Sequence, residues 1–129
     1  GEDYAVIFMD MLAQNYNKKL VSHSQASREN TISLSFLKQL AMMLKKNGLI
    51  VSKEGVTGGY KLARDPKKIN LYEIVSAINS PRGLTTCCRG VHGKNGDCPK
   101  ENFCRAKKAW QRINQEMYEK LSSVTLADL

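Results

Sequence analysis

The sequence lacks an apolar run close to the length of about twenty residues that a membrane-spanning helix requires. No secretory signal peptide is recognisable, so we expect a cytoplasmic, reducing compartment. Histidine is scarce: the chain has only His23 and His92, and both lie in polar segments. No nucleophile and base stand in a recognisable arrangement, so the sequence does not predict an enzyme.

Acidic residues are also in short supply, with 12 Asp and Glu against 20 Lys and Arg and a net charge of +8. The positive excess is concentrated in residues 38–68, where eight basic residues and two acids give a net charge of +6. A concentrated positive face favours a polyanionic partner, although a plain lysine-rich surface has the same composition. With 129 residues, 42% of them hydrophobic, the chain is long enough for one domain and an appended element.

Cysteine is absent from most of the chain, and the four that are present fall within eighteen residues, at Cys87, Cys88, Cys98 and Cys104. The segment between them is polar and glycine-rich, so it cannot bury itself. Clustered thiolates are ligands for soft metal centres such as zinc, copper(I) or iron–sulfur clusters. Two disulfides are disfavoured, because the adjacent Cys87 and Cys88 cannot easily form two well-shaped bridges in so short a segment.

Apolar periodicity predicts three helices in the first fifty residues. The first covers Tyr4–Asn15 and is apolar almost all round, which indicates a buried helix. A short second helix begins near Ser22, His23 or Ser24 and ends at about Asn30. The third is N-capped by Ser33 and ends at Asn47-Gly48. Its predicted buried stripe is Leu34, Leu37, Leu40, Ala41 and Leu44.

A glycine-tipped hairpin follows the third helix. The predicted strands are Leu49–Val51 and Tyr60–Leu62, and they are joined by the loop Ser52–Gly59. Three glycines in that loop allow a tight turn that can approach another backbone. Two short helices, a third with exposed lysines and then a small hairpin predict a winged helix-turn-helix, so the expected fold is mainly α with a small β-wing.

Two further helices complete the prediction. A fourth helix covers Leu71–Ile78, and a long helix runs from about Lys100 to Ser123. The apolar stripe of the long helix is Ala106, Trp110, Ile113, Met117, Leu121 and Val124. Steps of three and four favour a coiled-coil-like homodimer contact, although packing on the chain's own core would give the same spacing.

The sequence accordingly divides into three parts. Residues 1–80 form the predicted winged helix-turn-helix DNA-binding domain, residues 81–104 the cysteine-rich cluster-binding loop, and residues 105–129 the dimerisation helix and tail.

Three segments, Ile32–Leu40, Leu44–Ile50 and Gly58–Ala63, resemble the Rrf2 family of bacterial winged-helix regulators, of the IscR, NsrR, RirA and SUF-system type. The start at Tyr4–Val6 and the closing Val124–Leu129 are similar to this family as well. The resemblance implies a transcriptional regulator that senses an iron–sulfur cluster. Such a protein would repress genes for cluster assembly, iron handling or nitrosative stress.

The resemblance also implies a ligand set. Cys88, Cys98 and Cys104 would hold a two-iron or four-iron cluster, with Cys87 as the alternate to Cys88. Asp3 of the partner subunit, or His92, would complete the coordination. Asp97 is a further oxygen donor in the loop, whereas Lys107, where some relatives have histidine, cannot be a ligand while it is charged.

Two cofactor alternatives stay open. Four thiolates would also suit a structural zinc ion. The Cys87-Cys88 pair would suit a thiol-redox switch without any metal.

Double-stranded DNA with an imperfect palindrome is the expected partner, because a dimer would present two third helices roughly 34 Å apart. Glu54 stands where IscR-like relatives carry an arginine, so base reading by the wing is not expected. Lys53 and Lys61 are expected to contact phosphates instead. The expected DNA contacts are Ser22, Ser24, Arg28, Ser33, Ser35, Lys38, Lys53, Thr57, Gly58 and Lys61.

Overall fold

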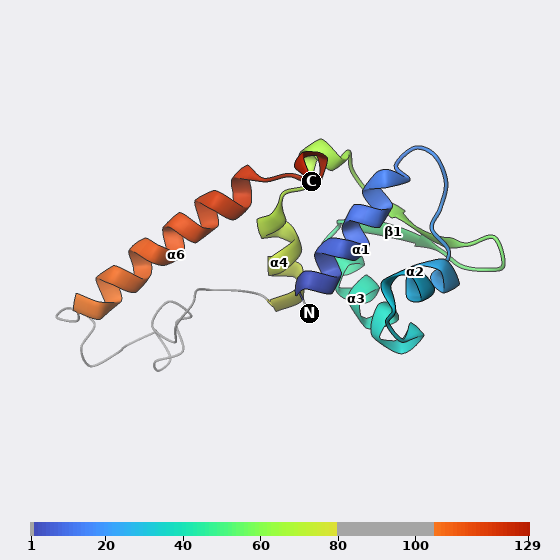
Figure 1. Cartoon of the computed structure of the whole chain (residues 1–129), viewed down its shortest axis with the longest axis horizontal. Helices are drawn as coiled ribbons and strands as arrows, with labels where there is room; N and C mark the ends of the chain where they lie inside the picture. The colour runs from blue at the N-terminus through green and yellow to red at the C-terminus, as the bar shows by residue number, and fades with distance from the viewer. Residues whose placement is uncertain (1, 80–104) are drawn as a thin grey trace.

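The computed structural model describes residues 2–79 and 105–129 of the chain (Figure 1). Its helices are α1 (Glu2–Gln14), α2 (His23–Asn30), α3 (Leu34–Lys46), α4 (Leu71–Asn79) and α6 (Arg105–Ser123). The two strands are β1 (Ile50–Lys53) and β2 (Gly59–Leu62), and two 3-10 turns are η1 (Pro66–Lys68) and η2 (Leu126–Asp128). The prediction of a mainly α fold with a small wing is confirmed.

Helix α1 buries one face only. Ala5, Phe8 and Met9 are fully buried at steps of three and one, and Leu12 follows at 1% exposure. The opposite side faces outward, and Ile7 is 53% exposed. The prediction of a buried helix therefore holds for one face only, and α1 makes its contacts with α2, β2 and α4.

Helices α2 and α3 form the predicted helix-turn-helix. The Ser22 hydroxyl caps α2 by accepting the Gln25 N–H at 3.1 Å, and Ser33 caps α3 by accepting the Phe36 N–H at 3.1 Å. Thr31, with a φ of 53°, ends α2 in the left-handed conformation. These caps satisfy backbone donors that a helix start otherwise leaves unpaired.

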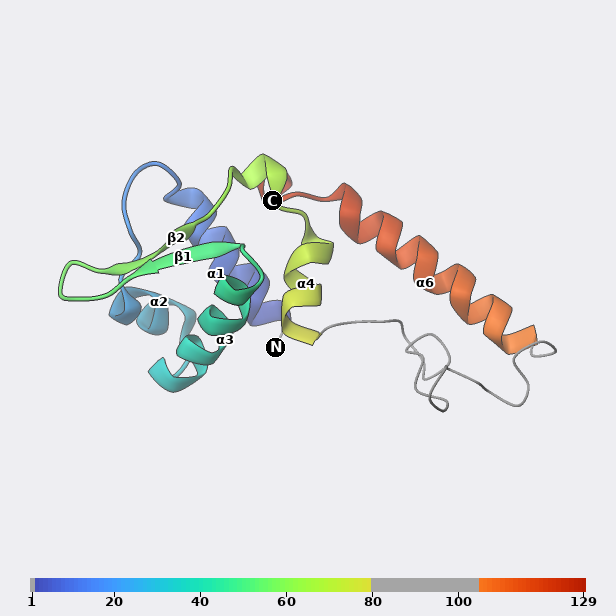
Figure 2. The ribbon, with the colours of Figure 1, turned by 180° about the vertical axis from the view of Figure 1, so that it is seen from behind.

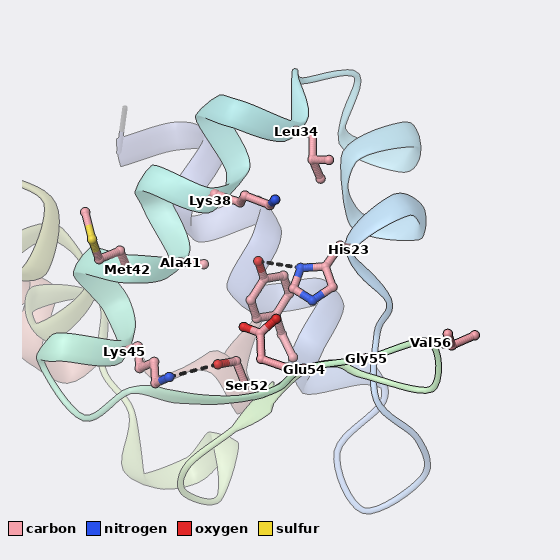
Figure 3. Close-up of a pocket in the computed structure, with 11 residues that line it drawn as sticks. His23, Leu34, Lys38, Ala41, Met42, Lys45, Ser52, Glu54, Gly55 and Val56 are labelled. Atoms are coloured by element: carbon pink, nitrogen blue, oxygen red, sulfur yellow. Dashed lines mark hydrogen bonds between the residues drawn. The ribbon is translucent and has the colours of Figure 1, made fainter.

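Four of the five stripe residues predicted for α3 are buried, namely Leu37, Leu40, Ala41 and Leu44. Leu34 was assigned to the core wrongly, because it is 43% exposed. Leu34 is the first residue of α3, which lies outside the core, and its side chain lines the pocket between α3 and the wing (Figure 3).

The wing is an antiparallel hairpin whose strands pair Ile50 with Leu62 and Lys53 with Gly59. Each strand is slightly longer than predicted. Tyr60 also exchanges two backbone hydrogen bonds with Val21, at 2.8 and 2.9 Å, so β2 is bonded on both edges. Because Val21 directly precedes the cap of α2, the wing is fixed relative to the helix-turn-helix.

Helix α4 packs between α1, α3 and α6. Its start is a reciprocal cap in which Glu73 N–H donates to Asn70 Oδ1 at 2.9 Å and Asn70 N–H donates to Glu73 Oε1 at 3.4 Å. Arg64 forms an ion pair with the same Glu73 carboxylate. The predicted span Leu71–Ile78 agrees with the structure to within one residue.

Helix α6 extends away from the body of the molecule, on the side opposite the wing (Figure 2). It contacts α4, with the Tyr72 and Tyr118 rings 4.5 Å apart, and none of its residues is buried. Its predicted start at Lys100 lies outside the described residues. The chain then returns to the body, because Leu126 is 3% exposed and its N–H donates to the Ile69 carbonyl at 3.0 Å.

In the described ranges 2–79 and 105–129, none of the helices combines the length and apolar character needed to cross a bilayer. The three-part division of the chain stays a prediction. The return of η2 onto α1 and η1 nevertheless joins the end of the third part to the first.

Candidate nucleic-acid interface

A groove of about 770 Å³ lies between α3 and the wing, and we call it the α3–wing groove (Figure 3). Its lining residues are His23, Leu34, Lys38, Ala41, Met42, Lys45, Ser52, Glu54, Gly55, Val56 and Tyr60. Three separate parts of the chain therefore meet here, namely the start of α2, one face of α3 and one face of the hairpin.

Helix α3 contributes a face that the core does not use. Lys38 is exposed and its ammonium group points across the groove, as Figure 3 shows. Ser33 and Ser35 are exposed at the same end of the helix. All three residues predicted to contact bases are thus accessible together at the N-terminal end of α3.

Exposed apolar residues accompany these polar groups. Leu34 is 43% exposed and Met42 is 65% exposed, and both line the groove. Sequence reasoning missed them as surface residues. The sequence did contain a signal for this exposed face, because Leu34, Lys38 and Lys45 recur at steps of four and seven and therefore share one face of the helix.

His23 and Tyr60 form the inner wall of the groove. His23 Nδ1 and the Tyr60 hydroxyl are 2.8 Å apart, and the two rings meet edge to face at 4.5 Å. Burial raises the pKa of Tyr60, and the nearby Glu54 carboxylate adds to the rise. Tyr60 is therefore a neutral hydrogen-bonding group at the base of the wing, a role that the sequence did not reveal for either residue.

Lys45 connects the far end of α3 to the wing. Its ammonium group donates to the Ser52 hydroxyl at 3.0 Å. A cation in the last turn of a helix is also favoured by the helix dipole. The contact joins the exposed surfaces of α3 and the hairpin at one end of the groove.

Helix α2 presents the residues predicted to hold the DNA backbone, with Ser22 and Ser24 at its start and Arg28 in its last turn. The Ser22 and Ser24 hydroxyls lie 3.4 Å apart, and Ser24 and Arg28 are exposed. Ser22 accepts a backbone N–H as the cap, so its O–H stays available to donate.

The wing residues predicted to contact DNA differ in accessibility. Lys53, Thr57 and Lys61 are exposed. Gly58 is buried, and a Cβ there would lie 2.0 Å from the Lys53 carbonyl oxygen. We therefore expect Gly58 to allow the tight turn of the wing rather than to contact DNA.

The predicted metal ligands Cys87, Cys88, Cys98, Cys104 and His92, together with Asp97, lie outside the described residues. Within the parts of the chain that the structure describes, no three His, Cys, Asp or Glu side chains are grouped to hold a metal ion. Asp3 is exposed in the first turn of α1, and a hydrogen bond from the Tyr4 backbone N–H lowers the pKa of its carboxyl. A helix N-terminus favours a carboxylate in the same way.

Comparison with known proteins gives consistent matches. The model of the Rrf2 family, described as iron-dependent transcriptional regulators, matches residues 1–129. The transcriptional regulator IscR of Cronobacter sakazakii is 34% identical over 126 residues, which cover 98% of this chain and 75% of that protein. IscR of Klebsiella pneumoniae is also 34% identical, over 98% of this chain and 74% of that protein.

Two solved structures share the fold. The structure of T. potens IscR aligns with a TM-score of 0.75 at 30% identity, over 98% of this chain and 80% of that one. The structure of CymR, the global cysteine regulator of B. subtilis, aligns with a TM-score of 0.79 at 25% identity, over 98% and 90%. The winged-helix arrangement is therefore shared along nearly the whole chain.

Proposed function

Because the chain belongs to the Rrf2 family of transcriptional regulators, we propose that it is a DNA-binding repressor whose affinity for its operator depends on an iron–sulfur cluster. One observation supports this most directly: Ser33, Ser35 and Lys38 are exposed together at the start of α3, and Lys38 lines the groove between α3 and the wing. A helix that projects polar side chains from its first turns, next to a hairpin, is suited to enter the major groove of DNA.

In this proposal α3 supplies the base contacts. Lys38 donates to guanine acceptors or to phosphate, and the Ser33 and Ser35 hydroxyls donate to or accept from base edges. The exposed Leu34 adds an apolar contact suited to a thymine methyl group.

The backbone contacts come from elements on either side of α3. Ser22 and Ser24 lie at the start of α2, where backbone N–H groups also favour phosphate, and Arg28 lies in the last turn of the same helix. The wing lies at the adjacent minor groove, with Lys53, Thr57 and Lys61 toward the duplex.

The donor set fits an iron–sulfur centre, because all four cysteines fall in the single stretch 87–104 and the described residues offer no competing metal site. Cys88, Cys98 and Cys104 would hold the cluster, with Cys87 as alternate and with Asp3 of the partner subunit or His92 as the fourth ligand. When bound, such a cluster supplies an oxidation-sensitive link between thiolates. Its ligands lie in the chain between α4 and α6, so binding constrains both. A coupling of about 1–3 kcal/mol would change DNA affinity roughly 5- to 150-fold.

A homodimer completes the proposal. The outward stripe of α6 includes Trp110 at 40% exposure and Ile113 at 44% exposure, which a second copy can cover. Two α3 helices would then read an imperfect palindrome with half-sites roughly 34 Å apart. We expect specific affinity on the order of 10 nM or tighter, with strong salt dependence.

Anaerobic purification followed by iron, sulfide and visible-absorption measurements tests the cluster. We expect iron and sulfide in stoichiometric amounts, a visible band, and loss of both in the Cys98→Ala variant. DNA binding is then measured before and after chelation on duplexes selected by the protein from a random pool. A wild type that stays colourless after cluster reconstitution would contradict the cluster proposal.

The same measurements separate the alternatives. Zinc without iron would indicate a structural four-thiolate site, which the presence of a fourth cysteine favours. Absence of metal with a reversible Cys87-Cys88 oxidation, detected by mass spectrometry after peroxide treatment, would indicate a thiol-redox switch.

A further inference from the structure

The two faces of the wing carry opposite charge. Side chains alternate along a strand, so Ser52, Glu54 and the paired Tyr60 line the α3–wing groove. Lys53 and Lys61 alternate to the other face. The face toward α3 thus presents a carboxylate, and the face away from α3 presents lysines.

A second groove, of about 790 Å³, lies along the lysine face, and we call it the outer groove. It is formed by the hairpin and by the loop that joins α1 to α2. That loop adds Lys18 and Lys19, so four lysines and no acid line the groove.

Local hydrogen bonds order the backbone of the loop that carries these two lysines. Asn17 adopts the left-handed conformation, with a φ of 60°, and the N–H groups of Lys18 and Lys19 donate to the Asn15 carbonyl at 3.0 and 3.3 Å. The Asn15 amide in turn donates to the Met11 carbonyl at 2.9 Å. The loop is therefore an ordered turn on the end of α1.

The described residues provide no ion-pair partner for the four ammonium groups. All four lysines are exposed, and none forms an ion pair with a residue in the described ranges. Like charges gathered in one concavity repel each other and attract an anionic ligand.

We propose that the outer groove binds the phosphate backbone of the operator duplex in the flank beyond the base pairs contacted by α3. This inference rests on the proposed function. A hairpin at a minor groove, which is only about 6 Å wide, has a phosphate strand on each side. The strand on the α3 side meets Lys38, Lys45 and Glu54. The strand on the outer side meets four lysines and no acid, so the net positive charge is larger on the outer side.

Continuity with the α3–wing groove favours DNA over an acidic protein. Lys53 and Lys61 belong to the same two strands as Ser52 and Tyr60. Ser52 lines both grooves, so the two surfaces are continuous across β1. Lys18 and Lys19 extend the contact along the duplex, away from α3.

The test compares two duplexes that carry the same site, selected by the wild-type protein from a random pool. One ends at the edge of the site, and the other continues on each side by about one helical turn, roughly 10 base pairs. Wild type should bind the longer duplex more tightly and with the steeper salt dependence. The K18Q/K19Q variant should lose that advantage, and its slope of log K against log[salt] should fall by about 0.9 for each phosphate contact removed.

The control variant is K67Q/K68Q, which removes two exposed lysines of η1 that line neither groove. It should keep both the length dependence and the salt slope of wild type. Circular dichroism on thermal unfolding checks that each variant is folded.

Each other outcome overturns the inference. If K18Q/K19Q matches wild type on both duplexes, the outer groove does not bind DNA, and an acidic protein becomes the better candidate while the proposed function stands. If K18Q/K19Q weakens both duplexes equally, the contact is not in the flank. If wild type selects no duplex at all, the proposed function fails together with the inference.

Discussion

At the scale of single residues, Tyr60 links the wing to the rest of the fold. Its hydroxyl meets His23 Nδ1 at 2.8 Å, its ring meets Phe8 edge to face at 5.5 Å, and its backbone pairs with Val21. Tyr60 as a whole is only 4% exposed, although its hydrogen bond with His23 is part-buried at the wall of the α3–wing groove. One side chain therefore joins α1, the start of α2 and β2.

The raised pKa of Tyr60 predicts a loss of stability in alkali. An unfolded tyrosine ionises near pH 10, whereas the folded one keeps its proton to higher pH. Stability from this group is therefore complete below about pH 10 and is lost as pH rises through the folded pKa. Tyr60→Phe should cost about 1 kcal/mol at pH 7 through the lost hydrogen bond and should reduce the alkaline loss.

Urea unfolding at pH 7 and above pH 10, in reductant, measures both effects. Tyr118→Phe is the matched control, because it removes another phenol hydroxyl on α6, remote from the wing. If Tyr60→Phe and wild type lose the same stability between the two pH values, the assignment to Tyr60 is wrong.

At the scale of elements, two glycines of the wing are required for different structural reasons. Gly59 has a φ of +155°, and a Cβ there would lie 2.3 Å from the Val21 carbonyl oxygen. Gly55 has a φ of +101° but has no heavy atom within 4 Å of such a Cβ. Gly55 thus meets only a conformational requirement, whereas Gly59 also allows the hairpin to pair with Val21.

The two glycines make a matched pair of substitutions. Gly55→Ala should cost about 1–2 kcal/mol of unfolding free energy through backbone strain alone. Gly59→Ala should cost more, because the Val21 backbone must also move and its hydrogen bonds with Tyr60 weaken. Chemical denaturation compares the two, and equal losses would show that the contact with Val21 does not restrict position 59.

The same elements show which structural features could be predicted from the sequence. Caps at Ser22 and Ser33 and the stop at Gly48 were predictable, because local hydrogen bonds and backbone conformation determine them. The exposure of Leu34 was not predictable, because periodicity identifies the apolar face of a helix but not the point along the helix where the core ends. The pairing of His23 with Tyr60 depends on residues 37 apart and has no local signal.

The candidate interface divides in the same way. The lysines and serines of α3 were predictable from their place off the apolar stripe. Which face of the wing is acidic and which is basic required the strand register, because a slip of one residue would exchange the faces of Lys53 and Glu54.

At the scale of the whole molecule, α6 and the wing lie at opposite ends of the body (Figure 1). Helix α6 has 19 residues and none is buried, although Tyr72 and Tyr118 connect it to α4. An amphipathic helix that leaves Trp110 and Ile113 half-exposed does not complete its packing within the described chain. A second copy that contacts α6 would place its own wing and α3 at the far side of the assembly, as a palindromic operator requires.

Ile113→Glu tests this arrangement. In a symmetric contact the substitution acts twice, and each buried isoleucine contributes about 1.5–3 kcal/mol that the carboxylate would lose, in addition to its own desolvation. We expect a monomer by light scattering at concentrations where wild type is a dimer, and at least a tenfold loss of affinity for the full palindrome, about 1.4 kcal/mol. Binding to a single half-site should change little, because α3 and the wing are remote from α6.

Gln111→Glu is the control, since it adds the same charge at an exposed position of α6 that is not part of the apolar stripe. It should remain a dimer with wild-type affinity. If Ile113→Glu also remains a dimer, the subunits associate through another surface and the spacing of the two α3 helices must be derived from that surface instead. If both variants become monomers, added negative charge along α6 rather than burial of the apolar stripe explains the effect.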